Sequence, residues 1–188
     1  MAEKNLIKIY VDASSAKRVD IIIKHYTDFI GIVDGYTEGL RYMIECEKDS
    51  NSHRALGDLG VRVQTGGSTS DPTAKKAIRN VMTREALINC DFSGDVMEGV
   101  DRAEEFIRDA YLLRDMRKDY ELFNRQLSIL GTEKETFEKY LRREKTLIDI
   151  AEEQGITYES AQQKIHKIRL WVKKQVVGFM DGKMGGIA

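Results

Sequence analysis

The most informative stretch of the sequence lies near the C-terminus: Thr146-Leu-Ile-Asp-Ile-Ala-Glu-Glu-Gln-Gly155-Ile-Thr-Tyr-Glu-Ser-Ala-Gln-Gln-Lys-Ile-His-Lys-Ile-Arg-Leu-Trp171. Thr146 is suited to cap a short helix, and Asp149 three residues later completes a capping box. Gly155 supplies the left-handed residue that ends this helix, and Thr157 is suited to cap the next one. Small Ala151 lets a second helix cross closely. The pattern predicts two helices joined by a tight turn, a helix-turn-helix, with Ile156 filling the corner.

The second helix of this pair combines a buried stripe with a cationic surface. Its apolar residues are spaced four, three and four, at Ala161, Ile165, Ile168 and Val172. The other faces carry one acid, Glu159, and five bases: Lys164, Lys167, Arg169, Lys173 and Lys174. In a helix-turn-helix the start of this helix enters the DNA major groove, where polar side chains reach base edges. The pattern predicts base contacts from Tyr158, Glu159, Gln162, Gln163 and His166, and phosphate contacts from Lys164, Lys167 and Lys173.

Two positions in this stretch depart from the usual apolar pattern. Gln154 stands where an aliphatic residue commonly precedes the glycine. Lys164 stands where an apolar residue is common, and Ile165 takes the burial one step later. An ordinary helical hairpin with a solvated charged face is the alternative interpretation. Capping residues, a small residue, a glycine and clustered positive charge coincide here, and together they favour DNA binding.

Length and charge bound the class of protein. The chain has 188 residues, of which 32% are charged and one is proline, which is typical of a helix-rich protein of one or two domains. The net charge of −1 hides an asymmetry. From Leu141 onward nine Lys and Arg stand against six Asp and Glu, whereas between Asp91 and Glu121 five stand against ten. A basic end suits a chain that meets nucleic acid with one part only.

The sequence offers no pattern for an enzyme, a metal site or a membrane span. Cys46 and Cys90 are far apart and the three histidines are scattered, so no metal-ligand spacing exists and the thiols are expected to be reduced. No nucleophile–base arrangement and no phosphate-binding loop is recognisable. The longest apolar run, Phe29 to Val33, is too short to cross a membrane. We therefore expect no enzymatic activity, no metal, no cofactor and no membrane partner.

The N-terminal part is expected to be a long helix. A heptad stripe from Val19 to Met43 predicts one helix over about residues 15–47. Gly31, Gly35 and Gly39 within it indicate either a close helix approach or a break near residues 34–35. The stripe fits an intramolecular core, and a homodimer seam is the alternative. Residues 5–12 fit either a short strand or the frayed start of a helix.

The middle of the chain predicts further helices. Pro72 is suited to the first position of a helix that continues to residue 89, after a linker rich in Gly and Ser. A second stripe, from Phe106 to Leu130, predicts a long helix that ends at Gly131. Thr132 with the acid three residues later predicts a capping box for a short helix that leads into the helix-turn-helix.

Together these elements predict an all-α protein. An elongated N-terminal half of long heptad-patterned helices precedes a C-terminal tri-helical helix-turn-helix domain. The expected segments are a coiled-coil-like region at 1–65, a linker at 66–73, a central helical region at 74–131, the helix-turn-helix DNA-binding domain at 132–178 and a flexible tail at 179–188.

Residues 147–171 resemble region four of bacterial sigma factors, through Ile150-Ala-Glu-Glu-Gln-Gly-Ile-Thr157. This resemblance implies that Thr157, Tyr158, Glu159, Gln162, Gln163 and His166 face the DNA groove. Most of the chain resembles the ArpU-like and RinA-like late-gene activators of phages and prophages of Gram-positive bacteria. The corresponding residues are Leu59-Gly-Val-Arg-Val-Gln64, Ser70-Asp-Pro-Thr73, and Met116-Arg117 with Tyr120.

What the resemblance implies is a transcriptional regulator that binds double-stranded DNA and assists bacterial RNA polymerase in the cytoplasm of the host. We therefore predict a sequence-specific DNA-binding regulator, a phage or prophage late-gene activator. The alternative is an oligomeric helical adaptor or a phage DNA-packaging recognition protein, in which the heptad stripes build the oligomer.

Overall fold

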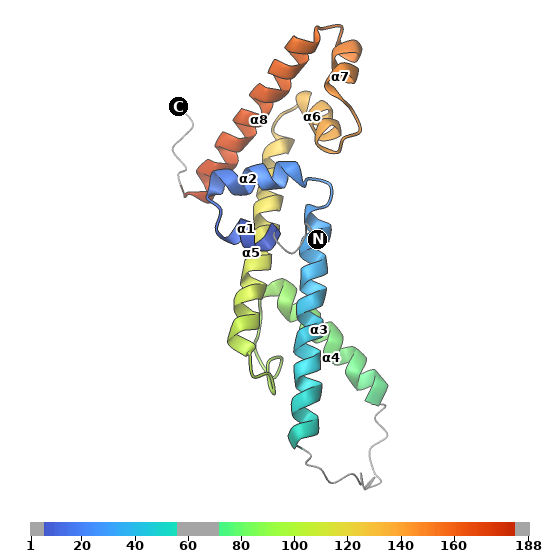
Figure 1. Ribbon diagram of the computed structural model, residues 1–188, viewed down its shortest axis with the longest axis vertical. Helices are drawn as coiled ribbons and strands as arrows, with labels where there is room; N and C mark the ends of the chain where they lie inside the picture. Colours follow the sequence, from blue (N-terminus) through green and yellow to red (C-terminus); the bar gives the residue numbers. More distant parts are fainter. Residues whose placement is uncertain (1–5, 56–71, 183–188) are drawn as a thin grey trace. The chain divides into compact units, whose positions relative to one another are not determined.

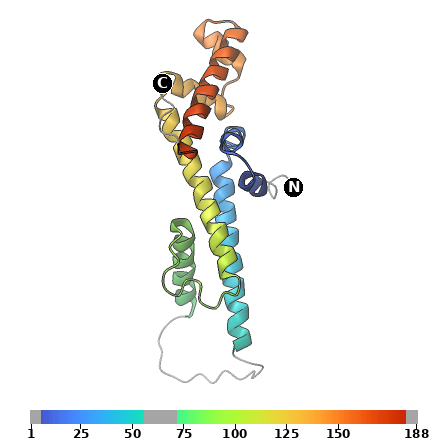
Figure 2. The same cartoon turned by 90° about the vertical axis from the view of Figure 1, so that its left-hand side faces the viewer.

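The computed structural model describes residues 6–55 and 72–182, and within these ranges every regular element is an α-helix (Figures 1 and 2). The expected all-α class is confirmed. None of the described helices is both long and apolar enough to cross a bilayer. The helices are α1 (Leu6–Val11), α2 (Ser15–Lys24), α3 (Phe29–Ala55), α4 (Pro72–Asn89), α5 (Ala103–Ser128), α6 (Glu133–Leu141), α7 (Leu147–Gln154) and α8 (Tyr158–Met180).

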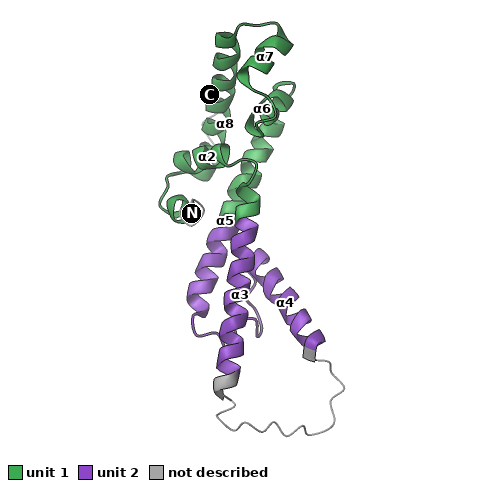
Figure 3. Ribbon diagram, turned by 45° about the vertical axis from the view of Figure 1, so that its right-hand side comes forward, with its two compact units in different colours: residues 1–32, 116–188 green, residues 33–115 purple. Residues whose placement is uncertain are grey.

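These helices form two compact units, which Figure 3 colours separately. Unit 1 comprises residues 1–32 and 116–188, and unit 2 comprises residues 33–115. Because α3 and α5 each contribute to both units, the division does not follow the expected segments 1–65, 74–131 and 132–178. α1 and α2 share a unit with the helix-turn-helix. The expected linker residues 66–71 and the tail from residue 183 lie outside the described residues, and α8 continues to Met180.

An aromatic cluster joins the N-terminal helices of unit 1 to α5. The Phe29 ring stacks on the Tyr120 ring with 5.5 Å between centroids, and Tyr26 lies 5.7 Å from Tyr120. The buried Tyr10 ring lies 5.6 Å from Phe29, and its hydroxyl donates to Asp119 at 2.8 Å. Burial and the Asp119 carboxylate both raise the pKa of Tyr10. The cluster buries large aromatic rings, and the hydroxyl of buried Tyr10 keeps Asp119 as a hydrogen-bond partner. This bond avoids the cost of an unsatisfied buried polar group.

The expected single helix over residues 15–47 is wrong, because the chain leaves the helical path between α2 and α3. His25 ends α2 with its N–H donating to the Ile21 carbonyl at 3.0 Å, and a turn over residues 25–28 follows. Tyr26 lies in this turn and is still buried in the aromatic cluster. The apolar residues therefore keep their spacing of three and four across the turn, although the helix is interrupted there. The break expected near residues 34–35 is absent, since α3 is continuous there.

Two further expectations for the N-terminal part are corrected. Residues 6–11 form α1, so the strand interpretation is wrong and the helical one is right; Leu6 and Tyr10, four apart, are its buried residues. Gly31, Gly35 and Gly39 do not accommodate a close helix approach, because a Cβ at any of the three would meet nothing within 4 Å among the described residues.

Unit 2 buries apolar residues from α3, α4, α5 and the α4–α5 connection, and polar links also join α3 to α4. The Thr83 hydroxyl donates to the buried Glu45 carboxylate at 3.1 Å, and Glu38 accepts from Arg41 at 2.9 Å and from Arg84 at 2.7 Å. Its buried apolar residues are Val33, Leu40, Ile44, Ala86, Leu87, Val100, Phe106, Ala110 and Leu113.

The apolar patterns of α3 and α4 are only partly buried. On α3 the predicted stripe member Met43 is 42% exposed and Ile44 is buried instead, because a straight helix of 3.6 residues per turn drifts from a seven-residue repeat. The expected helix at 74–89 is confirmed and begins at Pro72. However, Ile78, Val81 and Met82 of α4 are exposed.

The junction between α5 and α6 differs from its prediction. α5 ends at Ser128, three residues before Gly131, whose φ is +59°. Thr132 precedes α6 but makes no side-chain cap, so the capping box predicted with Glu135 is wrong. A cap hydroxyl reaches the helix N–H groups from an extended backbone, whereas Thr132 has φ −66° and ψ −21°.

The two threonines provide a matched test of helix capping. Thr146→Ala removes a formed capping box and should lower the free energy of unfolding by about 1 kcal/mol. Thr132→Ala removes no cap and should change it by less than about 0.5 kcal/mol. Urea unfolding followed by far-UV circular dichroism measures both. Equal losses in the two variants would contradict the capping assignment.

Candidate nucleic-acid interface

The turn between α7 and α8 forms as its sequence predicts. Thr146 Oγ1 accepts from the Asp149 N–H at 3.3 Å, and the Asp149 carboxylate accepts from the Thr146 N–H at 2.7 Å. Gly155 has φ +61°, a conformation that favours glycine. Thr157 Oγ1 then accepts from the Ser160 N–H at 3.2 Å and caps α8. The predicted caps and the glycine turn of the helix-turn-helix are confirmed.

α8 buries one apolar stripe along most of its length. The stripe consists of Ala161, Ile165, Ile168, Val172 and Val176. α7 packs beside the first turns of α8, and α2 packs against its C-terminal half (Figures 1 and 2). The sequence pattern predicted the first four stripe residues but not the contribution of α2. Ile156 is 36% exposed, so the prediction that it fills the corner is wrong.

The two polar residues that interrupt the apolar pattern bind each other. Lys164 Nζ donates to Gln154 Oε1 at 3.1 Å and lies 3.5 Å from the Glu133 carboxylate at the start of α6. Lys164 therefore links α8 to both α7 and α6. Because a half-buried ammonium is costly without partners, these bonds explain how both departures are accommodated in the turn.

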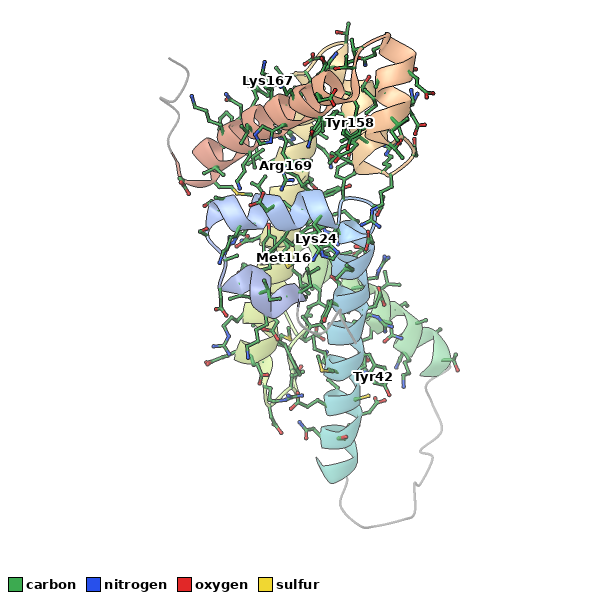
Figure 4. All side chains as sticks on the ribbon, turned by 45° about the horizontal axis from the view of Figure 1, so that its top comes forward. Lys24, Tyr42, Met116, Tyr158, Lys167 and Arg169 are labelled. Atoms are coloured by element: carbon green, nitrogen blue, oxygen red, sulfur yellow. The ribbon has the colours of Figure 1, made fainter. Side chains whose placement is uncertain are left out.

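The residues predicted to contact bases are all exposed. Thr157 is exposed at the cap, and the other five lie on two neighbouring faces of α8. One face carries Tyr158, Gln162, His166 and Arg169, and the other carries Glu159, Gln163, Lys167 and Lys174. Figure 4 shows Lys167 and Arg169 on different sides of the helix, with Arg169 on the side of α2. The two faces together present donors and acceptors to an approaching ligand.

The three lysines predicted to contact phosphates differ in their surroundings. Lys167 is exposed and has no ion pair within the described chain. Lys164 is held by Gln154 and Glu133, and Lys173 Nζ donates to Asp20 of α2 at 2.5 Å. Lys167 is therefore the one of the three whose charge is not already engaged by a carboxylate of the described residues.

Asp20 fastens α2 to α8. Its carboxylate accepts from Arg169 at 3.0 Å as well as from Lys173, and the Ser15 hydroxyl donates to Asp181 at 2.5 Å further along. Partial burial raises the pKa of Asp20, but the hydrogen bonds from Lys173 and Arg169 outweigh burial and hold the pKa below its usual value. These partners are 149 and 153 residues apart in sequence, so no local pattern predicts them.

α2, the α6–α7 turn and α8 border a groove of about 660 Å³. Tyr158, Gln162 and His166 of α8 form one wall. The cations that line the groove are Lys24, Arg143, Lys145 and Arg169. The sequence pattern did not predict a role for Lys24 or Arg143, since neither lies in the helix-turn-helix stretch.

The described residues contain no group of three or more His, Cys, Asp or Glu side chains arranged to hold a metal ion. Cys46 is exposed and Cys90 is half-buried, and neither forms a disulfide with another described residue. Side chains of α8 and its neighbours offer hydrogen bonding and positive charge at this surface.

Comparisons with known proteins found no relative. No protein-family model matches the chain, no curated protein matches it, and no solved structure matches it. The geometry itself defines an all-helical protein in which two capped helices, α7 and α8, are joined by a tight glycine turn and the second carries exposed polar faces. Any assignment of function rests on those residues.

Replacing Asp20 tests the link between α2 and α8. Asp20→Asn should unfold more easily at neutral pH by about 1 kcal/mol, since one carboxylate loses two cationic partners at a partly exposed site. The folded-state pKa is depressed, so this stability is present above the unfolded pKa of about 3.9 and is lost as pH falls through the folded value.

The difference between the parent and Asp20→Asn should therefore shrink as the pH falls below about 4, in urea unfolding measured across that range. Asp12→Asn, at an exposed carboxylate between α1 and α2, is the control and should change little. A difference for Asp20→Asn that is constant over the whole pH range would contradict the ion-pair assignment.

Proposed function

We propose that this protein is a sequence-specific DNA-binding transcriptional regulator whose α8 lies in the major groove. The observation that carries the proposal is the exposed polar start of a helix that is capped and braced from behind by α7. Gln162 and Gln163 offer the amide pattern that pairs with adenine, and Glu159 offers an acceptor for cytosine. In a helix-turn-helix these positions are the ones that meet base edges.

Positive charge on α8 supports the same proposal. Lys167 and Lys174 lie on the outward face, and neither makes an ion pair with the described residues. Phosphate contacts of this kind supply affinity that is independent of sequence and weakens as salt rises. The outward face of α8 thus combines groups for reading bases with groups for holding the backbone.

The resemblance to sigma region four and to phage late-gene activators extends the proposal to a biological role. In this view the protein is a phage or prophage late-gene activator that acts with bacterial RNA polymerase in the host cytoplasm. What supports it is the residue pattern of the turn, Ile150 to Thr157, together with its formed caps.

Two groups of variants separate base reading from phosphate binding. Gln162→Ala with Gln163→Ala should reduce the preference for a selected site over random duplex by about 10- to 100-fold, because each bidentate amide contact discriminates by about 1–3 kcal/mol. Lys167→Ala should weaken binding to both duplexes and reduce the slope of log affinity against log salt by about 1.

Fluorescence anisotropy titrations at several salt concentrations measure both effects, after the site has been obtained by selection from random duplexes. Lys118→Ala, an exposed lysine on α5, is the control for loss of a charge elsewhere. Identical site preference and identical salt slopes in all variants and the parent would refute the proposal.

Exposed apolar side chains on α4 favour a second candidate, an oligomeric adaptor or DNA-packaging recognition protein. Ile78 is 61% exposed, Val81 57% and Met82 50%, and a cluster of apolar residues of this kind often marks a protein interface. Light scattering with size-exclusion chromatography distinguishes the candidates. A monomer or dimer is expected for the regulator, whereas a ring of roughly eight copies or more would favour packaging and contradict it.

A further inference from the structure

The groove between α2 and α8 is lined by cations and by no acid. Among the described residues that border it, Lys24, Arg143, Lys145 and Arg169 are cationic, and neither Asp nor Glu is present. A groove of similar size in unit 2 is different, because three acids line it together with two cations. The chain as a whole has 31 Asp and Glu against 30 Lys and Arg, so a lining of one sign is a local feature.

Two of these cations have no carboxylate partner. Arg169 is paired with Asp20, and Lys145 is paired with Glu153. Lys24 and Arg143 are both exposed and make no ion pair with any described residue. They therefore offer uncompensated positive charge from two sides of the groove, α2 and the α6–α7 turn, and a groove of this kind attracts anions.

The backbone conformation of Arg143 also favours a role for this residue in anion binding. Its φ is +61°, in the left-handed region that disfavours residues with a side chain. Glycine would suit this turn better, yet the position carries a long cation at the groove. Backbone preference therefore does not explain the residue, whereas contact with an anion would.

The other wall of the groove indicates which anion. Tyr158, Gln162 and His166, on one of the two α8 faces proposed to contact bases, line it directly (Figure 4 labels Tyr158, Arg169 and Lys24). When the start of α8 occupies a major groove, the sugar–phosphate backbone bordering that groove runs past the flank of the helix and the preceding turn. The phosphates and the cations are then on the same side of the protein.

We infer that this groove receives backbone phosphates of the same DNA duplex, with Lys24 and Arg143 as phosphate contacts. The inference rests on the proposed function and deepens it. It places α2, more than a hundred residues away in sequence, in the DNA-contacting surface, so that this surface extends beyond residues 132–178. Asp20 has a positioning role here, because its bonds to Arg169 and Lys173 hold α2 against α8.

The test compares Lys24→Gln, Arg143→Gly and the double variant with Lys17→Gln in the full chain. Lys17 is an exposed lysine of α2 that does not line the groove, so it controls for charge on the same helix. Affinity for a random-sequence duplex and for a selected site is measured over a range of salt. Thermal unfolding is measured in parallel.

Each groove variant should weaken binding to both duplexes by roughly three- to tenfold near 0.1 M salt and lower the salt slope by about 1, with about 2 for the double variant. The ratio of selected to random affinity should stay unchanged, because phosphate contacts carry no sequence information. Arg143→Gly should not lower the melting temperature, since glycine adopts the left-handed backbone freely, and this separates a lost contact from a lost fold.

The outcomes are distinguishable. If the parent binds DNA and the double variant shows the parent's affinity and slope, the groove inference is overturned while the proposed function stands. Equal losses in Lys17→Gln and Lys24→Gln would also overturn it, because the effect would then be general charge and not the groove. A parent that binds no duplex at low salt overturns the proposed function and the groove inference together.

Discussion

The apolar stripe of α8 is the constraint on which unit 1 depends. α8 has 23 residues and is about 34 Å long, whereas α7 has 8 residues and reaches only about 12 Å. α7 alone would leave the far end of the stripe, at Val172 and Val176, without cover. The N-terminal helix α2 supplies that cover and is fixed there by Asp20. Helices α2 and α8, which lie far apart in sequence, therefore share one core. The stretch at residues 146–171 includes residues of only one of the two.

Burying this stripe determines what the rest of α8 presents. With one side against α7 and α2, the remaining faces place Gln162, Gln163 and His166 at the surface near the capped start. The same packing decides which lysines of α8 are paired within the protein. Lys164 and Lys173, which lie closer to the buried side, are satisfied by groups of the protein, and Lys167 on the outward face is not. Packing thus sorts the lysines of one cationic helix into structural residues and residues available to a partner.

The sequence predicted best those features whose determinants lie within a few residues of one another. The Thr146 capping box, Gly155 and the Thr157 cap formed as expected, because each depends on backbone and side-chain groups within one turn. The break after Lys24 was not predicted, because heptad spacing gives only the number of residues between apolar side chains. It does not show whether the chain stays helical between them. The Asp20 link and the groove were missed because their partners come from distant segments. Gln154 and Lys164 each depart from the apolar pattern, and their mutual hydrogen bond together with the Glu133 carboxylate accounts for both.

The central claim is that the exposed start of α8 lies in the major groove of DNA. Dimethyl sulfate methylates guanine N7, which faces the major groove, and adenine N3, which faces the minor groove. The most direct measurement is therefore methylation protection on a duplex saturated with the protein at its selected site. If α8 lies in the major groove, guanine N7 within that site should be protected and adenine N3 should show little protection. Protection confined to adenine N3, or no protection on a saturated duplex, would contradict it.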